Sequence, residues 1–178
     1  MPIIKIYPSK RPVRGILQYI TRGDTVPEEL IRTNGCDILD AEQEFSDIAR
    51  YYNKPTGAGN RTYYHMIVSY NTTYEKISPE EVRDMVKDLC QRTKIDCYQW
   101  YLAVHTDRPD HMHAHVVINN VSYRGDRKQH VKAGKSFQST GKLRHELMEK
   151  GNVICKERGY EHSLVNTKSK AQERLTRA

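Results

Sequence analysis

Alternation of apolar and polar side chains, with the period of two that characterises a β-strand, runs through three segments of the chain. In the first, large apolar side chains occupy the even positions, and His65 and Ser69 stand among the odd ones. The other two segments repeat this layout. One face of the resulting sheet should therefore pack on helices, while the other carries polar and aromatic groups for a ligand. The three segments are residues 62–70, 98–105 and 113–121, and a short strand closed by Pro8 is also expected at residues 3–7.

Apolar residues spaced three and four apart predict four helices, at residues 11–19, 40–53, 78–90 and 140–158. Ser78-Pro79-Glu80-Glu81 is the strongest start signal, because it combines a serine cap, a proline in the first turn and the glutamate of a capping box. Residues 21–39 contain two glycines and a proline and are expected to form a long loop or lid. This order of elements predicts an α+β domain with a central antiparallel or mixed sheet and helices packed mainly on one face.

A length of 178 residues with 37% hydrophobic and 29% charged side chains fits a single domain spanning residues 1–178. No apolar run approaches membrane-spanning length, so we expect a cytoplasmic protein without membrane insertion. The four cysteines lack CxxC spacing and are expected to be reduced and mostly buried. Residues 168–178 have helix-forming composition and end abruptly, which suggests the start of a C-terminal helix or linker in a longer protein.

The net charge of +7 favours a polyanionic partner such as nucleic acid. Five cations, offset only by Asp126, crowd the segment that follows the last strand: Arg124, Arg127, Lys128, Lys132 and Lys135. The first four of these are the expected DNA contacts. We expect this basic loop to lie beside the histidine site described next. The alternative is an ordinary solvated loop.

Four of the eight histidines lie within residues 105–115. Arg-Pro-Asp in this stretch is turn chemistry, and the flanking segments are strands, so the whole is expected to form a β-hairpin. A turn centred near Pro109 places His105 opposite His113, and His115 then points to the same face as His113. We therefore predict a metal site made by His105, His113 and His115, with His111 left in contact with Asp107 or solvent.

A solvated strand face is the alternative for these histidines, but three imidazoles in one register favour a metal. Three neutral nitrogens leave coordination positions open for a substrate, as in catalytic rather than structural sites. By the softness of its ligands the site suits Mn²⁺, Co²⁺, Ni²⁺ or Zn²⁺ better than Mg²⁺, although the availability of the ion in the cell also decides.

His105-x-Asp107-x5-His113-x-His115-x3-Asn119 resembles the third motif of conjugative relaxases of the MobP/VirD type, a branch of the HUH single-strand endonucleases. Gln18-Tyr19-Ile20-Thr21 resembles their first motif, which carries the nucleophilic tyrosine. Residues 64–70, which include Ser69, resemble the second motif, whose serine contacts DNA near the scissile phosphate. The three stretches occur in family order.

The resemblance implies strand-specific nicking of DNA at an origin of transfer, with Mn²⁺ or Mg²⁺ on the three histidines. Tyr19 would attack the scissile phosphate and form a 5′-phosphotyrosyl bond. Asp107 would either orient a ligating histidine or take the tyrosine proton, and both options stay open. Ser69 and Asn119 are candidate DNA contacts. The implied partners are origin DNA, as a single strand with an adjacent hairpin or duplex, other relaxosome proteins and a coupling protein, in the cytoplasm of a bacterium that carries a mobile element.

Several alternatives stay open on the sequence alone. Tyr51 and Tyr52 compete with Tyr19 as nucleophile, because the chain has twelve tyrosines. A rolling-circle replication initiator would use related chemistry. A three-histidine zinc hydrolase would use hydroxide instead of tyrosine, and an accessory DNA-binding protein would hold a structural ion and never nick its DNA.

Overall fold

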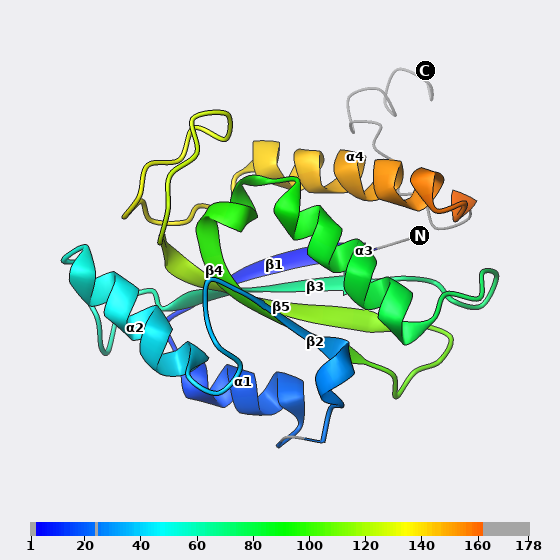
Figure 1. Cartoon of the computed structure of the whole chain (residues 1–178), viewed down its shortest axis with the longest axis horizontal. Helices are drawn as coiled ribbons and strands as arrows, with labels where there is room; N and C mark the ends of the chain where they lie inside the picture. Colours follow the sequence, from blue (N-terminus) through cyan, green and yellow to red (C-terminus); the bar gives the residue numbers. More distant parts are fainter. Residues whose placement is uncertain (1–2, 24, 162–178) are drawn as a thin grey trace, which may run out of the picture.

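The computed structural model describes residues 3–23 and 25–161, so the expected C-terminal helix or linker at residues 168–178 lies outside the described part. The chain forms one five-stranded sheet and four α-helices within those ranges (Figure 1). The strands are β1 (Ile3–Ser9), β2 (Ile31–Asn34), β3 (Tyr63–Ser69), β4 (Tyr98–His105) and β5 (His113–Ser122). The helices are α1 (Val13–Thr21), α2 (Ala41–Tyr51), α3 (Pro79–Gln91) and α4 (Gly141–Glu157), with the short 3₁₀ turns η1 (Glu28–Leu30) and η2 (Lys94–Cys97).

The sheet has the strand order β1-β3-β5-β4-β2, and every neighbouring pair is antiparallel. The α+β class and the antiparallel sheet are thus confirmed. β2 corrects the prediction that residues 21–39 form only a loop or lid, because Ile31–Asn34 pair with β4 at the edge of the sheet. β1 continues through Pro8, which is tolerated because an edge strand needs hydrogen bonds on one side only.

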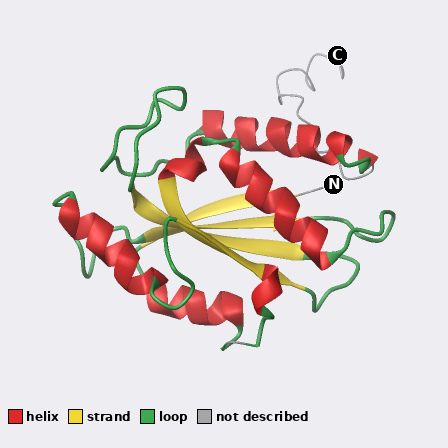
Figure 2. Ribbon diagram, viewed as in Figure 1, coloured by secondary structure: helices red, strands yellow, loops and turns green. Residues whose placement is uncertain are grey.

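Helices lie on both faces of the sheet (Figure 2). The longer α3 and α4 cover the face made by the even positions, where Met66, Trp100 and Leu102 are almost completely buried. This agrees with the expectation of helices packed mainly on one face. The shorter α1 and α2 depart from it, since Ile20 and Phe45 pack against odd positions of the sheet. They can do so because several of those positions are apolar, namely Tyr63, Tyr101, Ala103 and Val117.

None of the helices in the described ranges has the length and apolar character needed to cross a bilayer. All four cysteines lie within those ranges as thiols, and three of them are buried, as the sequence predicts.

The capping box expected at the start of α3 is present. The Ser78 hydroxyl accepts from the Glu81 backbone N–H, and the Glu81 carboxylate accepts from the Ser78 backbone N–H. The carboxylate also accepts from the Tyr160 hydroxyl, which follows α4. These bonds lower the pKa of Glu81, that from Tyr160 most strongly. One side chain therefore joins the start of α3 to the segment after α4.

Replacing Glu81 should make the free energy of unfolding depend less on pH. Because the folded pKa lies below the unfolded value of 4.5, the carboxylate stabilises the fold above pH 4.5. This contribution is lost as the pH falls through the lower folded pKa. Glu81→Gln should lower the free energy of unfolding more at neutral pH than at acid pH, so the difference between the two values should be smaller than in the wild type. The measurement is urea denaturation at both pH values. Glu80→Gln, at the exposed neighbouring position, is the matched control, and equal effects of the two variants would contradict the prediction.

Candidate active site

Three strands align polar side chains in one row across the sheet. His105 pairs directly with His113 in the register of β4 with β5, as the proposed turn near Pro109 requires. Ser69 pairs with the same His113 in the register of β3 with β5. His115 follows two residues further along β5, opposite Ala103. All of these residues face the side of the sheet on which α1 packs, because directly opposite residues share a face.

His105, His113 and His115 form a compact cluster in which one ring nitrogen of each lies within 4.8 Å of those of the other two. Hydrogen bonds to carbonyl oxygens assign two of the tautomers, because a carbonyl only accepts. His105 Nε2 donates to the Ile20 carbonyl at 2.7 Å, and His113 Nδ1 donates to the His111 carbonyl at 3.3 Å. The lone pairs that remain are on His105 Nδ1 and His113 Nε2.

His65 on β3 also belongs to this cluster, although the sequence analysis assigned it no role. Its Nε2 lies 2.8 Å from His115 Nδ1, and the two rings are stacked with centroids 5.0 Å apart. With His115 Nδ1 donating to His65, the lone pair of His115 is on Nε2. His65 occupies an odd position of its strand, as the histidines of the cluster do, so the sequence did contain a signal. Interpreting that signal required the pairing of β3 with β5.

The environment keeps the imidazoles of His65, His105 and His115 neutral. Burial, followed by the neighbouring His105 and His65, lowers the pKa of His115 to about 2. Burial and His105 lower the pKa of His65 to about 4, and burial also lowers the pKa of His105. Neutral imidazole is the form that binds a metal ion.

The donor set fits a divalent cation. His115 Nε2 is buried, and no group in the described part of the chain is hydrogen-bonded to it. A buried polar atom without a partner is costly, and a metal bond at this lone pair would satisfy it. Hydrogen bonds from the other ring nitrogens to Ile20, His111 and His65 orient the three rings, as is usual for histidine ligands of metals.

Tyr19 lies directly beside the histidine cluster. It stands in the last turn of α1 with 59% of its surface exposed, and its ring meets those of His115 and His105 edge-on, at centroid distances of 5.6 and 6.2 Å. The position follows from the amphipathic helix, which buries the adjacent Ile20 against the sheet and leaves Tyr19 toward solvent. The Ile20 carbonyl is also the partner of His105, so one hydrogen bond ties the end of α1 to the cluster.

Arg22 is a second site residue that the sequence analysis missed. It caps α1 in the left-handed conformation, with φ 51°, and its N–H bonds to the carbonyls of Gln18 and Tyr19. Its Nη2 lies 3.0 Å from Asp107 Oδ2 and 3.4 Å from His105 Nδ1. The hydrogen bond from Arg22 lowers the pKa of Asp107. The chain turns at Arg22 in the αL conformation, and helical periodicity does not reveal that the guanidinium then lies at the site.

Other expected site residues lie elsewhere or have other partners. His111 is exposed to solvent, one of the two outcomes expected for it, and its Nε2 lies 3.9 Å from Asp110 rather than beside Asp107. Asn119 is only 2% exposed, and its Nδ2 donates to the Phe45 carbonyl and to Gln99 Oε1. Asn119 thus fastens α2 to the sheet, and its amide protons are not available to DNA.

The two competing tyrosines lie away from the histidines. Tyr52 packs against Gly134, and the rings of Tyr51 and Tyr52 meet edge-on at 4.9 Å. Gly134 belongs to the basic loop after β5, at the far end of that strand from His113. Of these three tyrosines, Tyr19 alone contacts the cluster.

The basic loop does not lie beside the histidines, contrary to expectation. Arg124, Arg127, Lys128 and Lys132 follow the last residue of β5, whereas His113 is its first. The ten residues of β5, at roughly 3.3 Å each, separate the two regions by about 30 Å (Figure 1). The prediction erred because β5 runs straight away from the site instead of folding back.

Comparisons with known proteins agree with this arrangement. Residues 19–153 match the family described as "Relaxase: MobA/VirD2-like, nuclease domain". Two proteins of Staphylococcus aureus named "Protein rlx" are 28% and 26% identical to the chain over 143 residues, which is 80% of this chain but 40% and 38% of theirs. The chain therefore spans about two fifths of the length of these relatives.

A solved structure titled "Molecular Basis of Vancomycin Resistance Transfer in Staphylococcus aureus" has the same fold. It superposes with a TM-score of 0.62 and 11% identity, over 95% of this chain and 99% of the other. The family match covers most of the chain, including Tyr19 and all three clustered histidines. The chain therefore belongs to the MobA/VirD2-like relaxase family, of which it carries the nuclease domain.

Proposed function

We propose that this chain nicks one strand of DNA at an origin of transfer, in a metal-dependent reaction with Tyr19 as the nucleophile, to initiate conjugative transfer or mobilisation. The observation that carries the proposal is the placement of the exposed Tyr19 ring edge-on against His105 and His115. A phenol beside a three-histidine cluster matches tyrosine transfer chemistry. The alternatives of a hydroxide-using hydrolase and of a noncatalytic accessory protein give Tyr19 no role, and the relaxase family match favours nicking over replication initiation.

Each side chain has a defined task in this proposal. A divalent cation, Mn²⁺ or Mg²⁺ by the family resemblance and Zn²⁺, Co²⁺ or Ni²⁺ by ligand chemistry, would be held by His105, His113 and His115 and would polarise the scissile phosphate. Tyr19 Oη forms a bond to phosphorus as the bond to the 3′ oxygen breaks. The phenol proton leaves to solvent and the 3′ oxygen takes up a proton. The products are a 5′-phosphotyrosyl bond and a free 3′-hydroxyl.

Asp107 fits an orienting role better than that of a general base. Its carboxylate contacts Arg22, and the lowered pKa makes it a weaker base. If a cation were held at the lone pair of His105 Nδ1, Arg22 would keep its bond to Asp107, and its other donors would be free to contact the phosphate. In this proposal Ser69, which lies in one row with His113 and His105, contacts the same DNA segment.

The substrate in this proposal is origin DNA in the bacterial cytoplasm, processed together with other relaxosome proteins and a coupling protein. The basic loop with Arg124, Arg127, Lys128 and Lys132 is a second DNA contact, separate from the nick site. All four side chains are exposed there.

Tyr19→Phe should abolish the covalent protein–DNA product while DNA binding persists, because only the attacking oxygen is removed. The assay is denaturing electrophoresis after incubation with Mn²⁺ and single-stranded oligonucleotides tiled across the origin of the parent element. Tyr51→Phe, at an exposed tyrosine away from the histidines, is the matched control. An adduct that persists in Tyr19→Phe would refute the assignment of the nucleophile.

Metal affinity should depend on the cluster and on His65, but not on His111. His113→Ala removes a ligand and should abolish tight Mn²⁺ binding. His65→Phe removes the partner that orients His115 and should weaken binding by about 10- to 100-fold. His111→Ala should bind Mn²⁺ as the wild type does in isothermal titration calorimetry, and chelation by EDTA should stop adduct formation. Equal effects of His111→Ala and His113→Ala would point to a different ligand set.

Arg22→Gln should slow adduct formation by roughly 10- to 100-fold, because it removes the cation that joins Asp107 to the cluster. Asp107→Asn should act in the same direction with a smaller effect, since Asp107 acts through Arg22. The measurement is the single-turnover rate at saturating DNA. Arg14→Gln, an exposed arginine on the same helix, is the control. An unchanged rate in Arg22→Gln would exclude this arginine from the reaction.

A further inference from the structure

One donor of Arg22 occupies the lone pair that His105 would offer to a metal ion. His105 Nε2 donates to the Ile20 carbonyl, so the lone pair of the ring is on Nδ1, and Arg22 Nη2 lies 3.4 Å from that atom. A guanidinium has donors only, so Nδ1 is the acceptor of this hydrogen bond. A single lone pair holds either a hydrogen-bond donor or a metal ion. Arg22 and a cation therefore compete for the same atom of His105.

The charge of Arg22 also reaches the buried part of the cluster. Burial is the largest cause of the lowered pKa of His105, and the positive charge of Arg22 acts in the same direction. At His115, burial comes first, the neighbouring imidazoles follow, and Arg22 again lowers the pKa. A charge that repels a proton from these rings also repels a divalent cation. Arg22 thus blocks one ligand atom and opposes the charge of the ion.

The guanidinium can leave His105 without disturbing the fold. The backbone of Arg22 is fixed, because its N–H bonds to carbonyls in the last turn of α1. The side chain itself is 45% exposed, and its other partner, Asp107, lies 3.0 Å from Nη2 and is 41% exposed. Exposed ion pairs add little to stability, so they rearrange at little cost. Only the side chain of Arg22 has to move when a different partner binds it.

We propose that Arg22 couples the binding of the metal ion to the binding of DNA. Without DNA, the guanidinium bonds to His105 and lowers the affinity of the cluster for the ion. A DNA phosphate replaces His105 as its partner, because a guanidinium forms paired N–H···O bonds with phosphate and the anion neutralises its charge. By linkage, DNA and the ion then raise the affinity for each other by the same factor. The inference rests on the proposed function, which supplies the phosphate.

This role differs from that of a residue that only supports the site. Loss of a supporting residue leaves the ligands less well oriented and weakens metal binding, as predicted above for His65. Loss of a competitor strengthens metal binding. The sign of the change in metal affinity therefore separates the two roles, and it is measured without any reaction.

The first test is the affinity of the DNA-free protein for Mn²⁺, measured by isothermal titration calorimetry. Arg22→Met removes the donors and the charge but keeps an aliphatic stem. Neither side chain is branched at Cβ, so the left-handed backbone at this position, with φ 51°, is equally tolerable for both. The variant should bind Mn²⁺ about 10-fold more tightly, which is on the order of one hydrogen bond.

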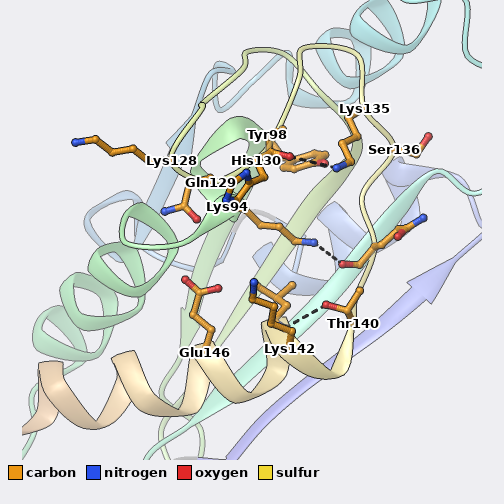
Figure 3. A pocket seen from close by; sticks show the side chains of 13 residues that line it. Lys94, Tyr98, Lys128, Gln129, His130, Lys135, Ser136, Thr140, Lys142 and Glu146 are labelled. Carbon is orange, nitrogen blue, oxygen red and sulfur yellow. Dashed lines mark hydrogen bonds between the residues drawn. The ribbon is translucent and has the colours of Figure 1, made fainter.

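Two matched controls remove one positive charge each. Arg108→Met changes an exposed arginine in the turn that follows β4, close to Asp107 in the chain. Lys142→Met changes a lysine that lines a pocket of about 390 Å³ at the first turn of α4 (Figure 3). That pocket lies on the other face of the sheet, since the adjacent Leu143 packs in the core beneath α3 and α4. Both controls should change the affinity for Mn²⁺ much less than Arg22→Met does.

The second test measures the coupling in Tyr19→Phe, which should bind DNA without forming the adduct. The probes are fluorescein-labelled single-stranded oligonucleotides tiled across the origin, followed by anisotropy with Mn²⁺ or with EDTA at constant ionic strength. The ratio of the two affinities is the coupling factor. Adding Arg22→Met should reduce this factor by about 10-fold, because direct contacts between the ion and phosphate are present with and without Arg22.

Weaker binding of Mn²⁺ to Arg22→Met would make Arg22 a supporting residue and overturn the competition. An equal gain in either control would mean that net charge alone is responsible, and an unchanged coupling factor would overturn the link to DNA. Asp107→Asn is the second variant. It removes the anion that offsets Arg22 and should weaken Mn²⁺ binding, so shifts of the same sign in the two variants would also contradict the proposal. Neither test depends on strand cleavage, so the nicking proposal and this one can fail independently.

Discussion

The register of β4 against β5 is the constraint on which the whole site depends. Side chains alternate between the faces of a sheet, so a slip of one residue would turn either His105 on β4 or both His113 and His115 on β5 into the core beneath α3 and α4. That slip is opposed by the even positions of both strands, where Leu102, Val104, Ala114 and Val116 are at most 1% exposed. Exchanging these side chains for imidazoles would bury polar nitrogens without partners, at a cost of about 1–3 kcal/mol each. Core packing on one face thus places the three clustered histidines on the other.

The hydrogen bond from His105 Nε2 to the Ile20 carbonyl couples α1, the helix that carries the proposed nucleophile Tyr19, to the cluster. This bond leaves the lone pair of His105 on Nδ1, and it holds the residue next to Tyr19 against the sheet. Arg22 continues the connection, because its αL conformation returns the guanidinium to His105 and Asp107. The orientation of the His105 ring and the position of the Tyr19 hydroxyl therefore depend on the same few residues at the end of α1.

Much of this arrangement could be predicted from the sequence, because it depends on residues that lie close together in the chain. The turn at residues 106–112 and strict alternation were sufficient to place His105 opposite His113, and the capping box marked the start of α3. The parts that were missed depend on contacts between distant segments. β2 is only four residues long and forms only by pairing with β4, and His65 joins the cluster only through the pairing of β3 with β5. The basic loop was misplaced for the same reason, since its distance from the histidines is set by the length and direction of β5.

The separation of the two regions by the length of β5 has a consequence for the proposed reaction. Nicking leaves one strand end covalently bound to Tyr19 and the other end as a free 3′-hydroxyl that must stay close for the strand to be rejoined. In the proposed reaction, DNA also held by the basic loop, about 30 Å away, would stay near the protein, so the effective concentration of the free end would be set by the short DNA segment between the two contacts. Noncovalent binding at the basic loop and covalent binding at Tyr19 would then act on the same DNA without competing for the same residues. The sheet would permit this arrangement, because its two ends and its two faces are far enough apart to keep the two DNA contacts separate.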